Sequence, residues 1–561
     1  MVPMHVLSAA EMQACDRATT AQFGVASIDL MRAAAAAVST FAQAQFPRAR
    51  RVTVLCGRGN NGGDGMMAAR LLAAAGPNGA GLDVTTLLLG APEGLGADVV
   101  TAWSELLASA RSGSVHVVEI AEQLAAHSEA LKADLLVDAV VGTGFKPPLK
   151  GLALAALEWA KQSRAPILSV DLPSGWAADT TAAAPAGAVF PSDAVITFTA
   201  PKPAHVFAEL TRRWDQPVVV APIGSPDEAA VSTLRVDWAG SSLALAHAPR
   251  AAGANKGNFG HVLVVGGSYS AIGVRSGAPS MTSLAALRSG AGLVTAAVPA
   301  AVLPLVAAVA PELMTWLLPA GAAGGISADC LTPEALAGLM AGKTVLAIGP
   351  GLGQAAETVK FVTGLLAATK IPAVIDADAL NILACKPVLL AKLAKGRTVV
   401  LTPHPGEMAR LAGITVAEVQ ANRLKVARGF AERFGVTLVL KGARTLIAHP
   451  DGRVAVNTTG NPGMAKGGSG DLLTGVVAGL LAQHPGEAGR AVEAAVCLHG
   501  LAADLAVREG DEHTLLATDS LPQISRAFRF QSRGENGYVW LQGGIACSRH
   551  CMQQPFMRYG E

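Results

Sequence analysis

The chain has 561 residues, of which 51% are hydrophobic and 15% charged, so it is too apolar to be disordered overall and long enough for about two to four domains. Lys and Arg number 44 and Asp and Glu 42, and with only 4% aromatic residues this balance argues against a nucleic-acid surface. Seven scattered Cys and an N-terminus without a basic region and apolar run predict a cytoplasmic protein without disulfides.

Apolar runs of strand length alternate with Ala- and Leu-rich helical patterns, which predicts an α/β fold with parallel sheets. In the first half, a glycine-rich turn over residues 56–65 follows the first strand, and a helix is expected over 66–75. The expected strands of this half are residues 52–56, 84–89, 135–138, 167–171, 194–198 and 218–221.

Polar residues follow three of these strands. Asn61 lies in the glycine-rich turn, Asp138 ends the run 135–138, and Ser174 comes shortly after Asp171. Because the carboxyl ends of parallel strands share one edge of a sheet, we expect a ligand there. The oxygen atoms of Asn61, Asp138 and Ser174 suit an alkali or alkaline-earth cation, and Asp171 could accept a hydrogen bond from a ligand hydroxyl. A purely structural turn is the alternative for each.

The periodic pattern weakens over residues 224–255, and we expect a domain boundary near Asp237. An uncharged stretch over 289–311 is long enough to cross a bilayer, but three prolines interrupt it, so a buried strand is expected instead. The expected strands of the second half are residues 262–265, 293–298, 344–348, 373–375, 398–401 and 437–440.

Polar motifs follow the strands of the second half as well. They present Asp376, His404, Glu407, Lys441 and Arg444. Taken singly, such residues are commonly loop histidines, turn caps or charges at a rim. Because they all follow strands of one predicted sheet, we expect them to converge on a pocket for nucleotide phosphates.

The stretch GNPGMAKGGSGDLLTG, residues 460–475, is the most specific motif of the chain. Gly463, Gly467, Gly468 and Gly470 precede Asp471, and an apolar helical pattern follows at once. Glycines let N–H groups close on an anion, and a helix N-terminus adds unpaired donors. We therefore expect the loop to hold a phosphoryl group while Asp471 removes a proton from the attacking hydroxyl. The alternative is a turn in which Asp471 caps the helix.

Beyond about residue 530 the apolar periodicity is lost. Two of the three Tyr and two of the seven Cys lie after Arg533. The predicted organisation is a first domain over residues 1–236, a second over 237–530, and an atypical, disordered tail over 531–561.

Together these motifs resemble the bifunctional nicotinamide-nucleotide-hydrate repair enzymes, in which an NAD(P)H-hydrate epimerase is fused to an ADP-dependent (S)-NAD(P)H-hydrate dehydratase. The resemblance covers about residues 7–528, and only the loop 266–279 looks longer than is usual in the family. It implies a Rossmann-like three-layer N-terminal domain followed by a ribokinase-like α/β domain. It also implies that R and S hydrates are interconverted and that the S hydrate is dehydrated to NAD(P)H, with release of AMP and phosphate.

In the first half the resemblance implies a potassium ion held by Asn61, Asp138 and Ser174. Asp138 is expected either to act as acid and base at C6 of the substrate or to hold this cation, and the sequence leaves both roles open. The hydrated cofactor is assigned to Asp171 and to two loops, Asn60, Asn61, Gly62, Gly63 and Asp64, and Gly142, Thr143, Gly144, Phe145, Lys146, Pro147 and Pro148.

In the second half the resemblance assigns the hydrated cofactor to Ala291, Gly353, His404 and Asp471. It assigns ADP, with Mg²⁺ bridging the phosphates, to Lys441, Gly442, Ala443, Arg444, Thr445 and Gly470. The expected partners are small molecules, namely hydrated NADH or NADPH and ADP, with no nucleic acid and no membrane, in a homo-oligomer.

Two other interpretations fit the same residues. A ribokinase-like kinase would use Asp471 as the same base but would need ATP and release a stable phosphorylated product. The first half could instead be a binding or scaffolding module without catalysis, although such a module would not need Asn61, Asp138, Asp171 and Ser174 together.

Overall fold

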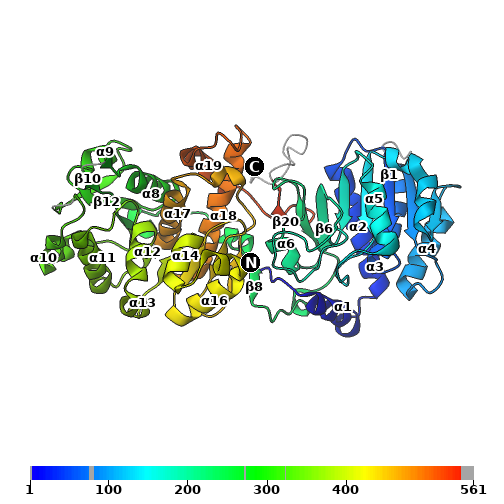
Figure 1. Ribbon diagram of the computed structural model, residues 1–561, viewed down its shortest axis with the longest axis horizontal. Helices are drawn as coiled ribbons and strands as arrows, with labels where there is room; N and C mark the ends of the chain where they lie inside the picture. Colours follow the sequence, from blue (N-terminus) through cyan, green and yellow to red (C-terminus); the bar gives the residue numbers. More distant parts are fainter. Residues whose placement is uncertain (1–2, 75–80, 271–272, 322–323, 545–561) are drawn as a thin grey trace. The chain divides into compact units, whose positions relative to one another are not determined.

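The computed structural model describes residues 3–74, 81–270, 273–321 and 324–544. Met4–Leu234 together with residues 531–544 form one compact unit, and Arg235–Phe530 form another. We call these the first and the second unit (Figure 1). The division falls two residues before the predicted boundary, because strand β8 (Val236–Trp238) pairs with β19 (Val454–Val456) of the second unit.

Within its described residues the first unit contains an eight-stranded sheet in the order β20-β7-β6-β5-β4-β1-β2-β3. All neighbours are parallel except β20 and β7. The sequence analysis missed β3 and β20. The strands are β1 (Arg51–Cys56), β2 (Asp83–Leu89), β3 (Val115–Val118), β4 (Leu135–Ala139), β5 (Ile167–Val170), β6 (Ala194–Phe198), β7 (Val218–Ala221) and β20 (Val539–Gln542).

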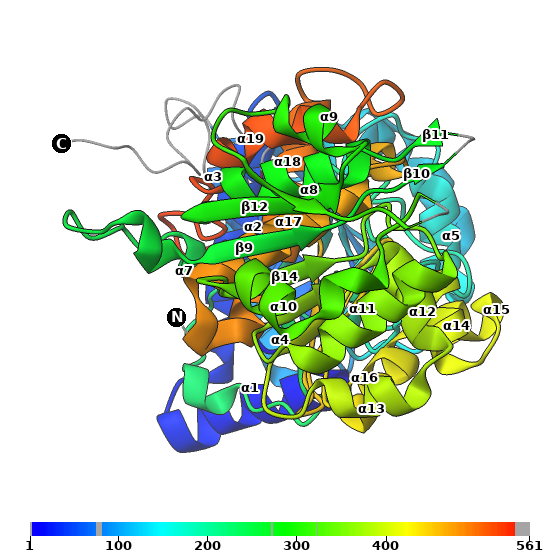
Figure 2. The same cartoon turned by 90° about the vertical axis from the view of Figure 1, so that its left-hand side faces the viewer.

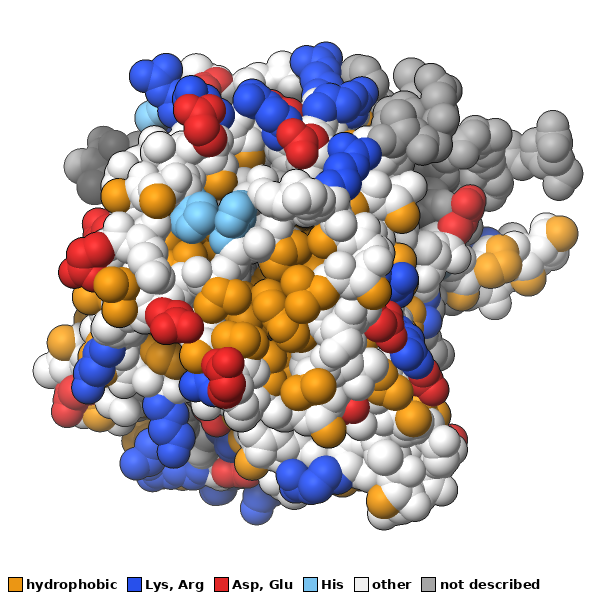
Figure 3. All heavy atoms as spheres, turned by 90° about the vertical axis from the view of Figure 1, so that its right-hand side faces the viewer, with side chains coloured by type: hydrophobic (Ala, Val, Ile, Leu, Met, Phe, Trp, Pro, Cys, Tyr) orange, Lys and Arg blue, Asp and Glu red, His pale blue; other side chains and the backbone are white. Residues whose placement is uncertain are grey.

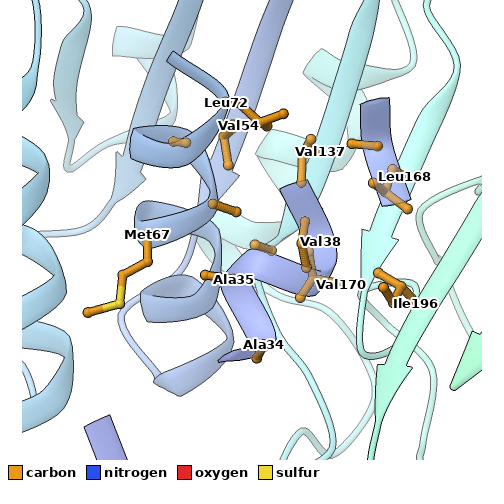
Figure 4. Packing of buried hydrophobic residues seen from close by; sticks show 14 of the residues in the cluster. Ala34, Ala35, Val38, Val54, Met67, Leu72, Val137, Leu168, Val170 and Ile196 are labelled. Atoms are coloured by element: carbon orange, nitrogen blue, oxygen red, sulfur yellow. The ribbon is translucent and has the colours of Figure 1, made fainter. Parts of the chain in front are cut away.

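Helices cover both faces of this sheet. Side chains of β1 alternate between the faces, so Val54 packs against α2 and α3, whereas Leu55 packs against α5. Figure 4 shows Ala34, Ala35 and Val38 of α2 over the inner strands. The predicted three-layer arrangement is therefore confirmed. The helices are α1 (Ala9–Phe23), α2 (Ser27–Gln45), α3 (Asn60–Ala74), α4 (Ala97–Ser109), α5 (Gly151–Ala160) and α6 (Pro203–Phe207).

The segment after residue 530 differs from the disordered tail that we expected. Strand β20 pairs antiparallel with β7 at the edge of the first sheet. The hydroxyl of Tyr538 donates to the carbonyl of Ala37 over 3.2 Å, and the ring centroids of Trp540 and Phe41 are 6.0 Å apart. The expectation is wrong for residues 531–544, and residues 545–561 lie outside the described part of the chain.

In its described part the second unit contains a ten-stranded sheet in the order β13-β12-β9-β14-β15-β16-β17-β18-β19-β8. The strands from β13 to β17 are parallel, and β18 reverses the direction. The bounds not yet given are β9 (His261–Val265), β12 (Leu293–Pro299), β13 (Met314–Leu318), β14 (Val345–Ile348), β15 (Ala373–Ile375), β16 (Val399–Leu401), β17 (Thr437–Leu440) and β18 (Leu446–Ala448).

Helices also cover both faces of the second sheet (Figure 2). The order of the strands runs one way from β9 to β12 and the other way from β14 to β17, so right-handed crossovers place α8 and α11 on opposite faces. The main helices are α8 (Gly277–Arg288), α10 (Pro333–Met340), α11 (Ala356–Ala368), α12 (Ala377–Ala384), α13 (Pro387–Leu393), α14 (Pro405–Ala412), α15 (Val416–Ala421), α16 (Arg423–Phe434), α17 (Ser469–Gln483), α18 (Ala488–Val507) and α19 (Ser520–Ala527).

No helix among the described residues has the length and apolar character needed to cross a membrane. The uncharged stretch that we tested forms β12 and the short helix α9 (Leu303–Ala307). Hydrophobic side chains are grouped on the face of the first unit that includes α4 (Figure 3). Val100 and Leu107 of α4 are exposed.

Candidate active sites

The order of the strands in the first sheet changes direction between β1 and β4. The two loops predicted to bind the substrate, residues 60–64 and 142–148, follow these two strands. Residues 60–64 lie in the first turns of α3, whereas we expected a turn before a helix at residue 66. Glycine at positions 57 and 62 lets two backbone segments come closer together than a side chain would allow. A Cβ on Gly57 would stand 1.9 Å from the carbonyl oxygen of Val140, and one on Gly62 would stand 1.8 Å from that of Gly57.

Asp138 lies at the end of β4 and is 1% exposed. Its carboxylate accepts hydrogen bonds from the Ser174 hydroxyl over 2.6 Å, the Ser174 N–H over 2.8 Å, the Ser169 hydroxyl over 2.9 Å and the Val140 N–H over 3.3 Å. Burial raises the pKa of Asp138 to about 6, although these donors act in the opposite direction.

The amide of Asn61 is buried and has no hydrogen-bond partner among the described residues on either its oxygen or its nitrogen. A Cβ on Gly142 would lie 3.2 Å from Asn61 Cγ and 2.7 Å from Asp171 Oδ2, so these residues meet. The Ser174 hydroxyl accepts from the Val141 N–H over 2.9 Å and donates to Asp138 over 2.6 Å. The amide oxygen of Asn61, buried and without a donor among the described residues, is a ligand of the kind that a hard cation such as potassium takes.

Asp171 follows β5 in a left-handed backbone conformation, with φ of 65°. Its Oδ2 accepts from both the N–H and the hydroxyl of Thr143, each over 2.6 Å. Its Oδ1 accepts from Lys202 Nζ over 3.0 Å. Burial alone would raise the pKa of Asp171, but the charge of Lys202 and the hydrogen bonds from Thr143 and Lys202 outweigh it and hold this pKa well below its usual range.

Two further carboxyl groups, those of Asp64 and Asp16, face Lys202. Asp64 was predicted to bind the substrate, whereas Asp16 and Lys202 were missed from the sequence. Burial raises the pKa of Asp64 well above its usual value, and the charges of Asp171 and Asp16 add to the effect. Burial also raises the pKa of Asp16, on α1. Three carboxyl groups and one buried ammonium group therefore share this edge of the sheet.

In the second unit, Asp376 follows β15 and is 1% exposed. It accepts from Lys441 Nζ over 2.9 Å, from the Thr402 hydroxyl over 2.8 Å and from the Thr474 hydroxyl of α17 over 2.9 Å. A Cβ on Gly470 would lie 3.3 Å from Lys441 Nζ. The ends of β15 and β17 and the start of α17 therefore meet, as the sequence predicted.

Asp471 stands in the first turn of α17, three positions before Thr474. The helix is capped by Gly468, in a left-handed conformation, so the alternative that Asp471 is the cap is wrong. Burial raises the pKa of Asp471 to about 6, the charge of Asp376 adds to this, and that of Lys441 opposes it. The carboxyl group thus sits in the first turn of a helix and can change protonation near neutral pH.

His404 caps α14, as its Nδ1 accepts from the Gly406 N–H over 3.0 Å. Its side chain is half-exposed, and its Nε2 lies 3.5 Å from the carboxylate of buried Glu407. Burial, and then the charge of Lys441, lowers the pKa of His404, so the ring is neutral at physiological pH. Burial opposes the charge of Lys441, but Asp376 and Glu407 outweigh it and raise the pKa of Lys441.

The loop after β17 follows Lys441 directly. Gly442 and Arg444 both have positive φ, of 128° and 53°, and Ala443 lies between them. The Thr445 hydroxyl donates to the Gly442 carbonyl over 2.8 Å, which closes the turn. Arg423 of α16 donates to the carbonyl of Leu440 over 3.2 Å and fixes the end of the strand.

Gly353 follows β14, and its N–H donates to Asp378 over 2.8 Å. Arg275, which lies in the loop 266–279, donates to the same carboxylate over 3.4 Å. Ala291 is different, because it precedes β12 and bonds to Ala286 at the end of α8. In a parallel sheet the amino end of β12 and the carboxyl end of β15 are opposite edges, so the structure does not bring Ala291 to the cluster around Asp376.

Comparison with known proteins agrees with both halves of this description. Residues 27–204 match the family model of the YjeF-related protein N-terminus, and residues 262–526 match that of NAD(P)H-hydrate dehydratase. A bifunctional NAD(P)H-hydrate repair enzyme of Moorella thermoacetica is 40% identical over 540 residues, which cover 94% of this chain and 97% of that protein. The chain belongs to the bifunctional NAD(P)H-hydrate repair enzyme family.

A second member of this repair enzyme family, from Escherichia coli, is 34% identical over 528 residues, or 94% of each chain. Among solved structures, an ADP/ATP-dependent NAD(P)H-hydrate dehydratase from Bacillus subtilis, co-crystallised with ATP and Mg²⁺, is 35% identical and covers 50% of this chain and 92% of its own, with a TM-score of 0.42. A ribokinase-like superfamily protein from Enterococcus faecalis is 28% identical and covers 53% and 97%, with a TM-score of 0.44.

Proposed function

We propose that the first unit interconverts the R and S hydrates of NADH and NADPH, and that the second unit dehydrates the S hydrate at the expense of ADP. The observation that carries the second activity is the half-buried Asp471 at the start of α17, beside the ion pair of Lys441 and Asp376. Membership of the repair enzyme family supports the first.

The dehydratase step begins with proton removal. Asp471 takes the proton from the C6 hydroxyl of the substrate as that oxygen attacks the terminal phosphorus of ADP, and the bond to the bridging oxygen breaks to release AMP. The C6–O bond then breaks, with the electron pair leaving on phosphate and the ring nitrogen supplying its lone pair. Loss of a proton from C5 completes the dihydronicotinamide.

Lys441 and the glycine loop hold the charge that moves in this step. An ammonium group has three donors, and the bond to Asp376 uses one of them, so others remain for phosphate oxygens. Residues 467–470 lie at and just before the start of α17, and their N–H groups are assigned to the transferred phosphoryl group. Mg²⁺, when bound, would neutralise phosphate charge and orient the ADP. His404 and Gly353 are proposed to contact the hydrated nicotinamide nucleotide.

In the first unit, Asp171 and residues 60–64 and 142–148 are proposed to bind the hydrated nucleotide. Asn61, Asp138 and Ser174 would hold potassium, which would fix the loop around Val141 and supply positive charge near the substrate. The four donors around Asp138 occupy its acceptor positions, which disfavours proton transfer at C6, and a cation at this carboxylate would have to replace one of these donors.

The decisive experiment incubates the full chain with a mixed R and S hydrate and excess ADP, while the absorbance of the dihydronicotinamide is followed. Full recovery indicates both activities, and recovery of only the S fraction indicates the dehydratase alone. A kinase would instead leave phosphate on a stable product, so the release of inorganic phosphate in proportion to recovered NADH separates the two. The homo-oligomer, the cytoplasmic location and the preference between NADH and NADPH hydrates stay predictions.

A further inference from the structure

A second polar network lies behind Asp171, on the side away from Thr143. Lys202 follows β6 and its side chain is 3% exposed. Its Nζ donates to Asp171 Oδ1 over 3.0 Å and to the Thr197 hydroxyl over 2.7 Å, and that hydroxyl donates to the same Oδ1 over 2.9 Å. A buried ammonium group is costly unless it is paired, so these bonds tie Lys202 to Asp171.

The network also holds the backbone of Asp171. His205, in α6, accepts from the N–H of Lys202 over 3.0 Å at Nδ1, so its Nε2 carries the proton that bonds the Asp171 carbonyl over 2.7 Å. Burial, and then the charge of Lys202, lowers the pKa of His205 to about 4, which keeps the ring neutral. Asp171 thereby keeps a left-handed conformation that non-glycine residues seldom adopt.

Nothing in the family assignment or in the proposed steps uses this network, yet it controls which atoms of Asp171 face the substrate loop. With Oδ1 taken by Lys202 and Thr197, only Oδ2 is directed to Thr143. The charged and titratable groups facing this site are Asp171, Asp64 of α3, Asp16 and Cys15 of α1, Lys202 and His205. Lys202 therefore compensates a group of three carboxyls.

We propose that Lys202 is a positioning residue for the epimerisation, which keeps Oδ2 of Asp171 oriented towards the loop over residues 142–148. The inference rests on the proposed function of the first unit. Without the ammonium group, Oδ1 of Asp171 would lose its charged donor, and the side chain could turn away from Thr143. The loop would then lose the charged acceptor that fixes Thr143.

The test measures kcat and KM for conversion of the pure R hydrate to the S hydrate without ADP, in full-length Lys202→Met and its parent. We expect kcat/KM to fall about 100-fold, as for a misplaced binding group, with KM raised more than kcat is lowered. Lys202→Arg retains a charged donor to Asp171 and should recover part of this loss. The surface variant Lys161→Met, whose partner is Glu158, controls for the loss of a lysine.

Dehydration of the S hydrate by the same preparations reports on the second unit and serves as an internal reference. If the parent chain does not interconvert the hydrates, the proposed function of the first unit fails. If the parent does so and Lys202→Met keeps the parental KM, or Lys202→Arg recovers none of the loss, the inference about Lys202 is overturned. The double variant Asp171→Asn/Lys202→Met should be no slower than Asp171→Asn alone, because the pair acts as one unit.

Discussion

Asp138 of the first unit and Asp471 of the second are both acidic groups whose pKa burial raises to about 6. Their surroundings differ. Asp138 is enclosed and accepts from donors of Ser169, Ser174 and Val140. Asp471 opens a helix, is half-buried, and owes the rest of its shift to the charge of Asp376.

The comparison shows that a raised pKa alone does not identify a catalytic base. A carboxylate whose lone pairs are filled by fixed donors is well suited to hold a loop in place, and poorly placed to receive a proton from a substrate. A carboxylate whose pKa is raised by a neighbouring charge, and which is open to a ligand, can receive a proton. The predictions below test this distinction, from the largest expected effect on turnover to the smallest.

The largest effect is expected for Asp471→Asn. An amide cannot take up the C6 hydroxyl proton, so dehydration should fall by about 10²- to 10⁴-fold. Binding of ADP, measured by calorimetry, should remain near that of the parent because Lys441 and the loop are intact. Conversion of R to S hydrate in the same protein is the control, and a near-normal rate of dehydration would remove Asp471 from the mechanism.

The pH dependence of dehydration should report the same carboxyl group. Because the pKa of Asp471 is raised and the base must be deprotonated, kcat/KM should fall as pH drops through about 6, by about tenfold per unit below it. Asp376→Asn removes a negative charge that raises this pKa, so its acid limb should move to lower pH while the rate falls about tenfold through loss of the Lys441 position. If the acid limb of the Asp376→Asn profile stays at the parental pH, the charge of Asp376 does not raise the pKa of Asp471.

Much of this second site could be read from the sequence. Residues 373–375 and 437–440 were predicted as strands and are β15 and β17 to the residue, because short apolar runs between turn signals are clear patterns. Polar residues after such strands must meet at one edge, so the cluster of Asp376, Lys441 and Gly470 followed from topology. Ala291 comes before its strand rather than after it, so it lies outside this cluster, and its assignment to the substrate rests on the family resemblance alone.

The sequence could not reveal contacts made by residues remote from any motif. Lys202 stands 31 positions after Asp171, in a turn that carries no pattern of its own. Strand β3 was missed because its four residues include His116 and are mostly half-buried, so alternation is weak. Strand β20 was missed because it is one short edge strand that follows a long series of apolar helical patterns. With no neighbouring strand in the sequence, it shows no alternation of strands and helices that would predict it.

A smaller effect is expected for Asp138→Asn. An amide would place N–H groups against the donors of Ser174, so the cation site should loosen and epimerisation should fall about 10- to 100-fold at low potassium. If Asp138 holds the cation, raising potassium should restore part of the rate. If it transfers a proton, no concentration of potassium would help. Dehydration, which needs none of these residues, is the reference.

The smallest effect on turnover, and the one confined to stability, is expected from ending the chain after Phe530. The first sheet would lose β20 and with it the buried side chains of Tyr538, Val539 and Leu541. Their burial contributes on the order of 2–4 kcal/mol after allowance for unfolded-state structure, so the first unit should melt several degrees lower.

Adding ADP shows which unit has lost stability, because a ligand raises the melting temperature only of the part that binds it. In a thermal scan the transition that ADP moves belongs to the second unit, and the truncation should lower the other. Leu541→Ala, in the full chain, should lower the same transition by a smaller amount, because it leaves the pairing of β20 with β7 in place. Two unchanged transitions would mean that the strand adds nothing to the first unit, and that this unit can be studied as residues 4–234 alone.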